Sequence, residues 1–157
     1  MENPISMNDK NNNDANRVLS GRIVPMKKYT QQEFDALPIV DGIKQCPTGD
    51  YSEIKSFGKR CSFGEGSSFG EGCSFGKRCS FENGHQAKQP PFIRINNIGS
   101  RGDGCYLYNF ENGIYVRSGC FFGTVDEFMQ AVHRKHSDTK FERQYKLAVE
   151  LAKAAFE

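Results

Sequence analysis

The sequence contains no tryptophan and no long run of apolar residues. A membrane-spanning helix needs roughly 20 mainly apolar residues, so no segment of this chain suits one. The N-terminal residues also lack the apolar stretch of a signal peptide, and we therefore expect a cytoplasmic protein. The formal net charge is only +2, which is too small to indicate a nucleic-acid partner.

The chain has only 157 residues, among them six cysteines and 16 glycines. This length gives room for one ordinary domain or two very small ones. An even number of cysteines permits a disulfide framework, but without an export signal we expect reduced thiols. No Cys-x-x-Cys spacing is present, so the sequence predicts neither a metal site nor a cofactor.

The N-terminal residues 1–25 have few apolar side chains and include an asparagine-rich tract. Such a segment cannot bury enough apolar area to offset the entropy of ordering, so we expect a disordered tail. Residues 26–45 predict a helical cap, because Thr30 and Glu33 form a capping box ahead of Phe34.

The region 46–90 repeats itself every six residues. Aromatic side chains mark the period at Phe57, Phe63, Phe69, Phe75 and Phe81. A small residue stands two positions before each of the last four rings, at Cys61, Ser67, Cys73 and Cys79. A flexible glycine-serine linker is the alternative, but exposed rings at constant spacing would only promote aggregation.

This pattern resembles the hexapeptide repeat of left-handed parallel β-helices, in which an apolar and a small residue recur at this spacing. In that family three consecutive hexads form one triangular coil. The resemblance therefore implies a short left-handed parallel β-helix of about two coils. The chain departs from the family pattern by placing Phe where Leu, Ile or Val is usual.

Residues 91–157 predict a β-β-β-α-α module that caps the repeats, so the fold class is mainly β with α. Residues 92–95 form an expected strand, and residues 105–122 a β-hairpin that turns on Asn112-Gly113. Residues 124–127 are a second capping box ahead of a helix. The last helix has one broad apolar stripe, formed by Phe141, Tyr145, Ala148, Leu151 and Ala155.

Three parts of this module, Gly99-Ser100-Arg101, residues 113–124 and Phe128, carry a second resemblance. They are similar to a module found behind hexapeptide repeats in uncharacterised bacterial and prophage proteins. The resemblance covers residues 26–157. It implies a phage-type accessory or inhibitor protein that acts on a host or defence macromolecule in the host cytoplasm, and it carries over no residue roles.

The hairpin sequence predicts two different faces. A two-residue turn at Asn112-Gly113 would place Tyr108 opposite Arg117, and Cys105 opposite Cys120 as packed thiols. One face would pack under the helices: Cys105, Leu107, Ile114, Val116, Cys120 and Phe122. The other would be aromatic: Tyr106, Tyr108, Phe110, Tyr115, Arg117 and Phe121. The aromatic face is interpreted first as a second core layer, and otherwise as a platform for a ligand.

Two basic pairs, Lys59-Arg60 and Lys77-Arg78, are three hexads apart and would stack on neighbouring coils. Like charges about 4.8 Å apart repel, so a ladder of four cations indicates an acidic partner. That partner would be a phosphate, an acidic protein surface or the glutamate-bearing face of a subunit in a homotrimer. The alternative is a solvated face that only keeps the surface soluble. On another face, Glu65 would stack with Asn83.

The leading hypothesis is a non-enzymatic binding module that engages another macromolecule through the charged repeat faces or the aromatic hairpin. The second is a small-molecule binder, in which Arg101, Tyr108, Tyr115 and Arg117 surround a phosphorylated ligand. The third is an acyltransferase, because many hexapeptide-repeat proteins are trimeric acyltransferases with a histidine base, and His85 ends the repeats. Two coils leave little room for an acyl-donor groove, which disfavours the enzyme.

Overall fold

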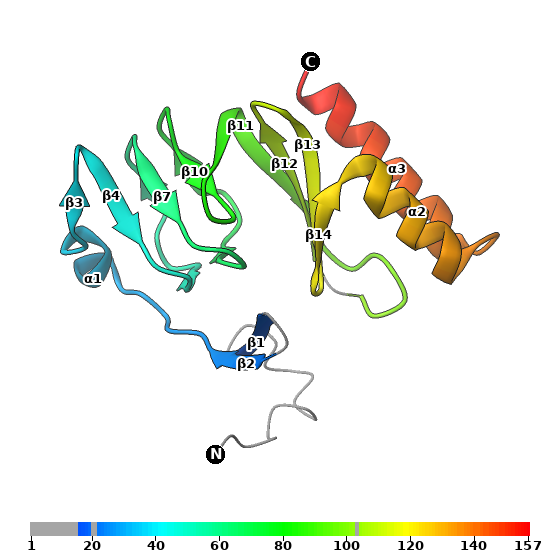
Figure 1. Cartoon of the computed structure of the whole chain (residues 1–157), viewed down its shortest axis with the longest axis horizontal. Coiled ribbons are helices and arrows are strands. Elements are labelled where there is room, and N and C mark those ends of the chain that lie inside the picture. The colour runs from blue at the N-terminus through cyan, green and yellow to red at the C-terminus, as the bar shows by residue number, and fades with distance from the viewer. Residues whose placement is uncertain (1–15, 20–21, 103) are drawn as a thin grey trace. The chain divides into compact units, whose positions relative to one another are not determined.

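The computed structural model describes residues 16–19, 22–102 and 104–157. Within the tail that was expected to be disordered, Asn16–Leu19 (β1) and Arg22–Pro25 (β2) pair as antiparallel strands (Figure 1). The other residues up to position 21 lie outside the described part. No helix among the described residues is long and apolar enough to cross a membrane.

The protein has a mixed α/β fold that is mostly sheet, with two helices at its C-terminal end (Figure 1). This confirms the expected combination of strands and helices. The chain divides into two compact units, Met1–His85 and Gln86–Glu157. The first unit holds the six-residue repeats, and the second holds the C-terminal module.

The first unit is built from three rows of short strands. The first row contains β3 (Ile39–Val40), β4 (Ile43–Cys46), β7 (Cys61–Phe63) and β10 (Ser80–Phe81). The other rows pair β5 (Asp50–Tyr51) with β8 (Ser68–Phe69), and β6 (Ser56–Phe57) with β9 (Ser74–Phe75). All these pairings are parallel except that of β3 with β4.

The strand registers follow the period of the sequence. Tyr51 pairs with Phe69, and Phe57 pairs with Phe75, which in both cases is a separation of three hexads. The pairing of β7 with β10 has the same separation, whereas that of β4 with β7 is one residue shorter. Strands three hexads apart therefore pair with each other, as the resemblance to hexapeptide repeats implies.

The aromatic rings of the repeat form the core of this unit. Phe57, Phe63 and Phe69 are each at most 2% exposed. Their ring centroids lie 5.0–5.6 Å apart in edge-to-face contacts between the three rows. Each row also stacks rings along its length, with 4.7 Å between Phe57 and Phe75 and 5.3 Å between Phe63 and Phe81. The rings thus hold neighbouring coils together as well as neighbouring rows.

The short helix α1 (Gln31–Asp35) joins this aromatic core from the N-terminal side. The Glu33 amide donates to Thr30 Oγ1 at 3.1 Å, and the Thr30 amide donates to the Glu33 carboxylate at 3.0 Å. This confirms the predicted capping box. The helix buries Phe34, whose ring meets Phe57 edge-on at 5.2 Å.

Glycine follows the ring in most hexads, because successive coils approach closely at that position. A Cβ added to Gly70 would lie 2.7 Å from the Ser52 carbonyl oxygen, and one at Gly76 would lie 2.6 Å from the Lys59 nitrogen. A Cβ at Gly58 would meet nothing within 4 Å. A Cβ at Gly64 would lie 2.7 Å from the Thr48 nitrogen. Glycine after the ring is therefore sterically required at Gly64, Gly70 and Gly76, and not at Gly58.

We predict that Gly70→Ala and Gly76→Ala each lower the free energy of unfolding, because the new methyl group overlaps backbone atoms. The expected loss is about 1–3 kcal/mol. Gly58→Ala is the matched control and should be neutral or slightly stabilising, since alanine restricts the unfolded chain. Urea unfolding followed by circular dichroism measures all three, and equal losses at the three positions would contradict the steric explanation.

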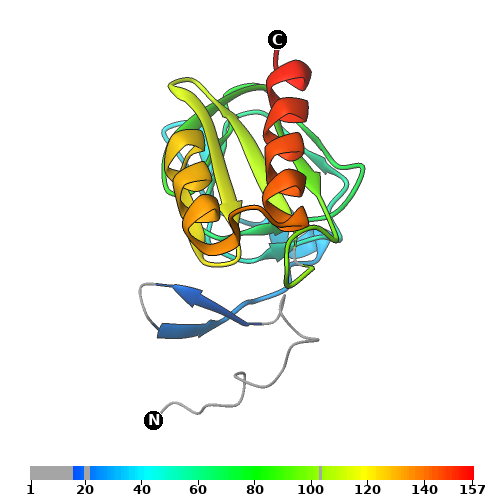
Figure 2. The same ribbon diagram turned by 90° about the vertical axis from the view of Figure 1, so that its right-hand side faces the viewer.

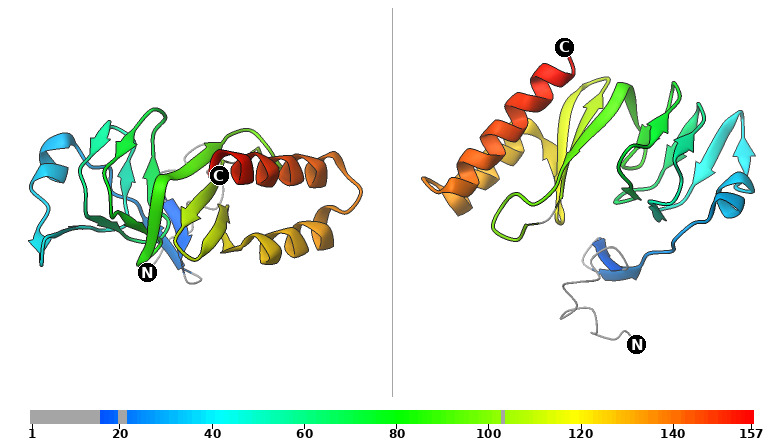
Figure 3. Two further views of the ribbon diagram at one scale, coloured as in Figure 1. Left: turned by 90° about the horizontal axis from the view of Figure 1, so that it is seen from above. Right: turned by 180° about the vertical axis from the view of Figure 1, so that it is seen from behind.

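The second unit is a four-stranded antiparallel sheet with helices on one face. Its strands, in order, are β11 (His85–Ile95), β12 (Cys105–Phe110), β13 (Gly113–Ser118) and β14 (Phe121–Thr124). The helices α2 (Val125–His136) and α3 (Lys140–Ala155) lie side by side against this sheet (Figures 2 and 3). β14 is one strand more than the predicted β-β-β-α-α order.

The apolar core of the second unit lies between the sheet and the two helices. It consists of Cys105, Leu107, Val116, Phe128, Val132, Ala148, Val149 and Ala152.

Thr124 caps α2 with its side chain and pairs reciprocally with Glu127, which confirms the second predicted capping box.

The hairpin of β12 and β13 turns one position earlier than predicted. Gly113 adopts a φ of 132° and begins β13, so the turn consists of Glu111 and Asn112. Tyr108 therefore pairs with Tyr115, and the predicted pairings of Tyr108 with Arg117 and of Cys105 with Cys120 are wrong. The partner changes by two residues, which leaves each side chain of β12 and β13 on its predicted face.

The predicted faces are wrong for the two phenylalanines of β14. Gly119, with a φ of 61°, helps to form a turn where a continuous strand was expected. Phe121 consequently lies on the helix side, with its ring 5.4 Å from that of Phe128. Phe122 joins the aromatic face, where its ring lies 5.5 Å from that of Tyr115.

The buried side of α3 also differs from the predicted stripe. Its buried residues are Glu142, Ala148, Val149 and Ala152. Leu151 is 54% exposed, Leu147 is 70% exposed, and Ala155 is also exposed. The helix turns Ala148 and Ala152 toward the sheet, where small side chains permit a close approach, and its two leucines away from it.

The connection between α2 and α3 is held by the Glu142 carboxylate. One oxygen lies 2.7 Å from His133 Nδ1, and the other accepts a hydrogen bond from the Asp138 amide at 2.9 Å. These hydrogen bonds, with that of His133 the larger influence, lower the pKa of Glu142 below its ordinary value of 4.5.

We predict that Glu142→Gln flattens the acid dependence of stability. A carboxyl group with a lowered pKa in the folded state stabilises the fold above its unfolded pKa, and this stabilisation disappears as the pH falls. Between about pH 5 and pH 3 the melting temperature of the wild type should fall further than that of the variant. Glu150→Gln, at an exposed position of α3, is the matched control. If the melting temperature of Glu142→Gln fell with pH as steeply as that of the wild type, the result would contradict this role of the carboxylate.

Candidate functional site

Four cations form a basic corner on the repeat unit: Lys59, Arg60, Lys77 and Arg78. They lie in two equivalent turns, one between β6 and β7 and the other between β9 and β10. The Arg60 amide donates to the Lys77 carbonyl at 2.9 Å, so the two turns stack directly on each other. All four residues are exposed. The structure thus brings these four predicted site residues together.

The two arginines of the basic corner have an unusual backbone conformation. Arg60 has a φ of 59° and Arg78 a φ of 63°. In the hexads between them, the corresponding positions are Gly66 and Gly72, with φ values of 74° and 75°. The left-handed conformation costs a non-glycine residue roughly 1–2 kcal/mol. Aligning the hexads with one another indicates this conformation, because arginine stands where the intervening hexads have glycine. The spacing of the charges alone does not indicate it.

The side chains of the basic corner have no partner in the described part of the chain, by hydrogen bond or by ion pair. Two other lysines of the same unit are paired, since Lys27 lies 3.0 Å from Glu33 and Lys28 lies 3.5 Å from Glu53. The corner therefore concentrates four cations that repel one another, and solvent and salt screen this repulsion.

A second corner of the repeats is compensated within the chain. Asn83 Nδ2 donates to the Glu65 carboxylate at 2.8 Å, and the Glu65 amide donates to Asn83 Oδ1 at 3.1 Å. This confirms the predicted stacking of these two residues across one coil. The Thr48 hydroxyl also donates to the Glu65 carbonyl at 2.8 Å. These polar groups stabilise the coil, and they are not left over for a ligand.

The aromatic face of the second unit is largely buried. Tyr108 is fully buried, and Arg117 is 5% exposed. The Arg117 guanidinium lies 4.3 Å from the centre of the Tyr106 ring, and its Nε donates to the Tyr108 hydroxyl at 3.4 Å. Tyr115 is half-buried, and its hydroxyl accepts from Asn112 at 3.3 Å. Packing of this kind favours the core interpretation of the face over the ligand platform.

Two further residues proposed for binding or catalysis lie outside this layer. Arg101 lies in an exposed turn, which a hydrogen bond from the Gly102 amide to the Gly99 carbonyl closes at 3.2 Å. His85 is half-exposed and begins β11. Neither position adds a nucleophile or a second base to a candidate catalytic site.

All six cysteines are free thiols, and four of them are buried. A hydrogen bond with Cys46, together with burial, raises the pKa of Cys61 to about 12. Burial raises the pKa of Cys105 to about 12. Such groups stay protonated at neutral pH and are poor nucleophiles. No group of three or more metal-ligating side chains occurs among the described residues.

We predict that iodoacetamide labels Cys120 first in the native protein, because Cys120 is exposed whereas Cys61 and Cys105 are buried with raised pKa values. Peptide mass spectrometry over a time course measures each site. Cys120→Ser should remove the fastest phase without exposing the others. Labelling of Cys61 or Cys105 at the rate of Cys120 would contradict the packing of the thiols.

No protein-family model matches this sequence, and the searches of curated proteins and of solved structures also find no match. The assignment of a function therefore rests on the geometry and the charges of the chain itself.

Proposed function

We propose that the protein is a non-enzymatic binding module whose basic corner holds an acidic surface of another protein. The observation that carries this proposal is the set of four exposed cations without partners among the described residues, two of them in a strained backbone conformation. Lysine supplies a mobile point charge, and arginine supplies a planar fork that matches a carboxylate. The two stacked turns therefore offer two such pairs to a row of carboxylates.

Solubility alone would not require this arrangement. In the intervening hexads, Glu65 and Glu71 carry the charge and are followed by Gly66 and Gly72 in the left-handed position. That arrangement places a charge on the surface without backbone strain. The basic hexads add a second charge at the strained position itself, which supports selection for cation density at this corner.

We further propose that the repeats form a short left-handed parallel β-helix, as the resemblance to hexapeptide proteins implies. Three observations support this assignment: parallel pairing at about the spacing of three hexads, buried aromatic rings, and turn residues with positive φ values. Experimental determination of the structure would read the handedness of the coil directly. The role as a phage-type accessory or inhibitor protein is part of the same proposal and is supported by the resemblance alone.

A corner variant tests the proposed binding site. It combines Lys59→Ser, Arg60→Gly, Lys77→Ser and Arg78→Gly, and its probe is a fluorescein-labelled decaglutamate peptide followed by anisotropy at low salt. We expect the variant to bind the peptide at least about tenfold more weakly than the wild type, because the complementary charges are lost. Higher salt should weaken the wild type toward the level of the variant.

A matched control separates the corner from net charge. It neutralises four exposed cations elsewhere, with Lys55→Ser, Lys88→Ser, Arg134→Gln and Lys135→Gln. This control should bind decaglutamate nearly as well as the wild type. Equal weakening of binding in both variants would show that net charge explains the effect. Unchanged binding in the corner variant would reject the corner as the binding site.

The stability of the corner variant distinguishes a binding role from a folding role. Glycine relieves the strain at positions 60 and 78, so Arg60→Gly with Arg78→Gly should raise the free energy of unfolding by up to about 1 kcal/mol per site. A gain in stability with a loss of binding supports residues kept for recognition. A loss of stability would show that the arginines serve the fold.

A further inference from the structure

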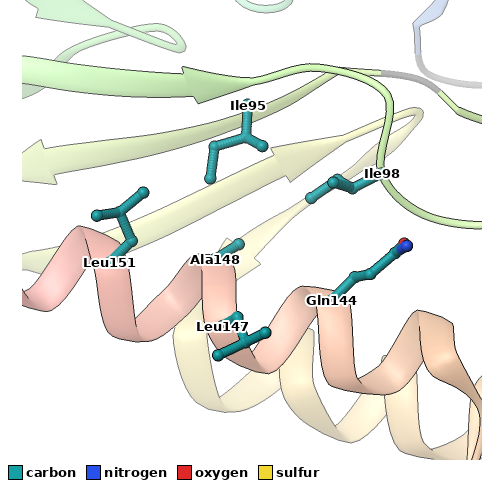
Figure 4. Close-up of a pocket in the computed structure, with 6 residues that line it drawn as sticks. All are labelled: Ile95, Ile98, Gln144, Leu147, Ala148 and Leu151. Carbon is teal, nitrogen blue, oxygen red and sulfur yellow. The ribbon is translucent and has the colours of Figure 1, made fainter.

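The outer face of α3 exposes two leucines one helical turn apart, Leu147 and Leu151. Beside them runs an apolar groove between the helix and the end of β11 (Figure 4). Its lining consists of Ile95, Ile98, Gln144, Leu147, Ala148 and Leu151. Leucines are among the most frequently buried residues, yet here alanines occupy the core side of the helix. The leucine pair therefore forms a surface that the described part of the chain does not cover.

The charges beside this leucine pair change sign along the helix. Arg143 and Lys146 precede the midpoint, whereas Glu150 and Glu157 follow it, and all four are exposed. Spacings of three and four residues keep Arg143, Lys146 and Glu150 on one side of the leucines, and Glu157 follows the end of α3 at Ala155. Lys153 is the exception to the pattern, and it pairs with Glu150 at 3.7 Å. The flank is thus basic toward the start of α3 and acidic toward its end.

An antiparallel second copy of α3 would be complementary to this flank. In a pair centred between Leu147 and Leu151, Leu147 meets the partner's Leu151. Arg143 then lies opposite the partner's Ala155, the last residue of α3, and the partner's Glu157 follows two residues later. Lys146 lies opposite the partner's residue 152, so it is displaced by two residues, about 3 Å along the axis, from the partner's Glu150. A parallel copy would instead place equal charges together.

We propose that two copies of this chain form a homodimer through antiparallel packing of α3. The two-fold arrangement uses one patch twice, which is the commonest way for a protein to associate with itself. Four leucines form the centre of the contact, and each groove lined by Ile95 and Ile98 receives apolar side chains of the partner. The complementary charges at the rim set the antiparallel direction. This dimer does not depend on the function proposed for the basic corner.

Analytical ultracentrifugation of the full chain tests the dimer. The wild type should sediment as a dimer at micromolar concentration, and Leu147→Glu or Leu151→Glu should raise the dissociation constant at least about a hundredfold. Both leucines are exposed, so circular dichroism should show an unchanged fold. Ile39→Glu is the matched control, because Ile39 is 64% exposed on the other unit. It should leave the dimer intact.

A charge exchange tests the antiparallel direction. Arg143→Glu or Glu157→Arg alone should weaken the dimer about tenfold by opposing like charges, and the double variant should recover most of the wild-type affinity. A monomeric wild type at high concentration overturns the proposal. So does an oligomer that the leucine variants leave intact, or a double variant no tighter than the single ones. The corner variant should keep the dimer, so failure here is distinct from failure of the proposed binding site.

Discussion

Stacking of aromatic rings along the repeats is the interaction on which the first unit depends. Most strands of the repeats contribute only two or three residues, so their hydrogen bonds alone join few positions. The rings add a continuous contact, edge-to-face between rows and stacked between coils, as for Phe57 on Phe75 at 4.7 Å. Each such aromatic pair contributes about 0.5–1.5 kcal/mol beyond its buried area. The close approach at Gly70 and Gly76 follows from this stacking, because rings can stack only if the coils come together.

The same stacking determines what the surface can present. A ring in every hexad brings every third hexad into register, so a basic turn in one coil lies on a basic turn in the next. The chain uses this register in two ways. At Glu65 and Asn83 the stacked side chains bond to each other at 2.8 Å and stabilise the coil. At the basic corner the stacked residues repel, and nothing in the described residues of the chain offsets them. One geometry therefore serves the fold at one corner and, as we propose, recognition at another.

The sequence predicted the features that depend on period and failed where one backbone angle decides the outcome. Both capping boxes follow from spacing alone. The register of three hexads, and with it the grouping of the four cations, follows from the six-residue period together with the resemblance to hexapeptide repeats. The turn at Gly119, with a φ of 61°, reversed the faces of Phe121 and Phe122, and no alternation pattern shows such an angle. The rotation of α3 was missed because Ala148 and Leu151 lie close together on the helix surface. The sequence allowed either residue to face the sheet. In the structure the smaller one does, because it lets the helix pack closely on the sheet. β1 and β2 arise in a segment whose polar composition gave no strand signal.

The two proposed surfaces have a joint consequence for binding. A dimer through α3 presents two basic corners, and a partner with two acidic patches can then engage both in one complex. The second contact then forms within the same complex, so the overall affinity exceeds that of one corner without any new kind of interaction. A short peptide engages only one corner and gains nothing from the dimer. The ratio of affinities for an extended and a short polyanion therefore reports on dimerisation, whereas the affinity for the short one reports on the corner alone.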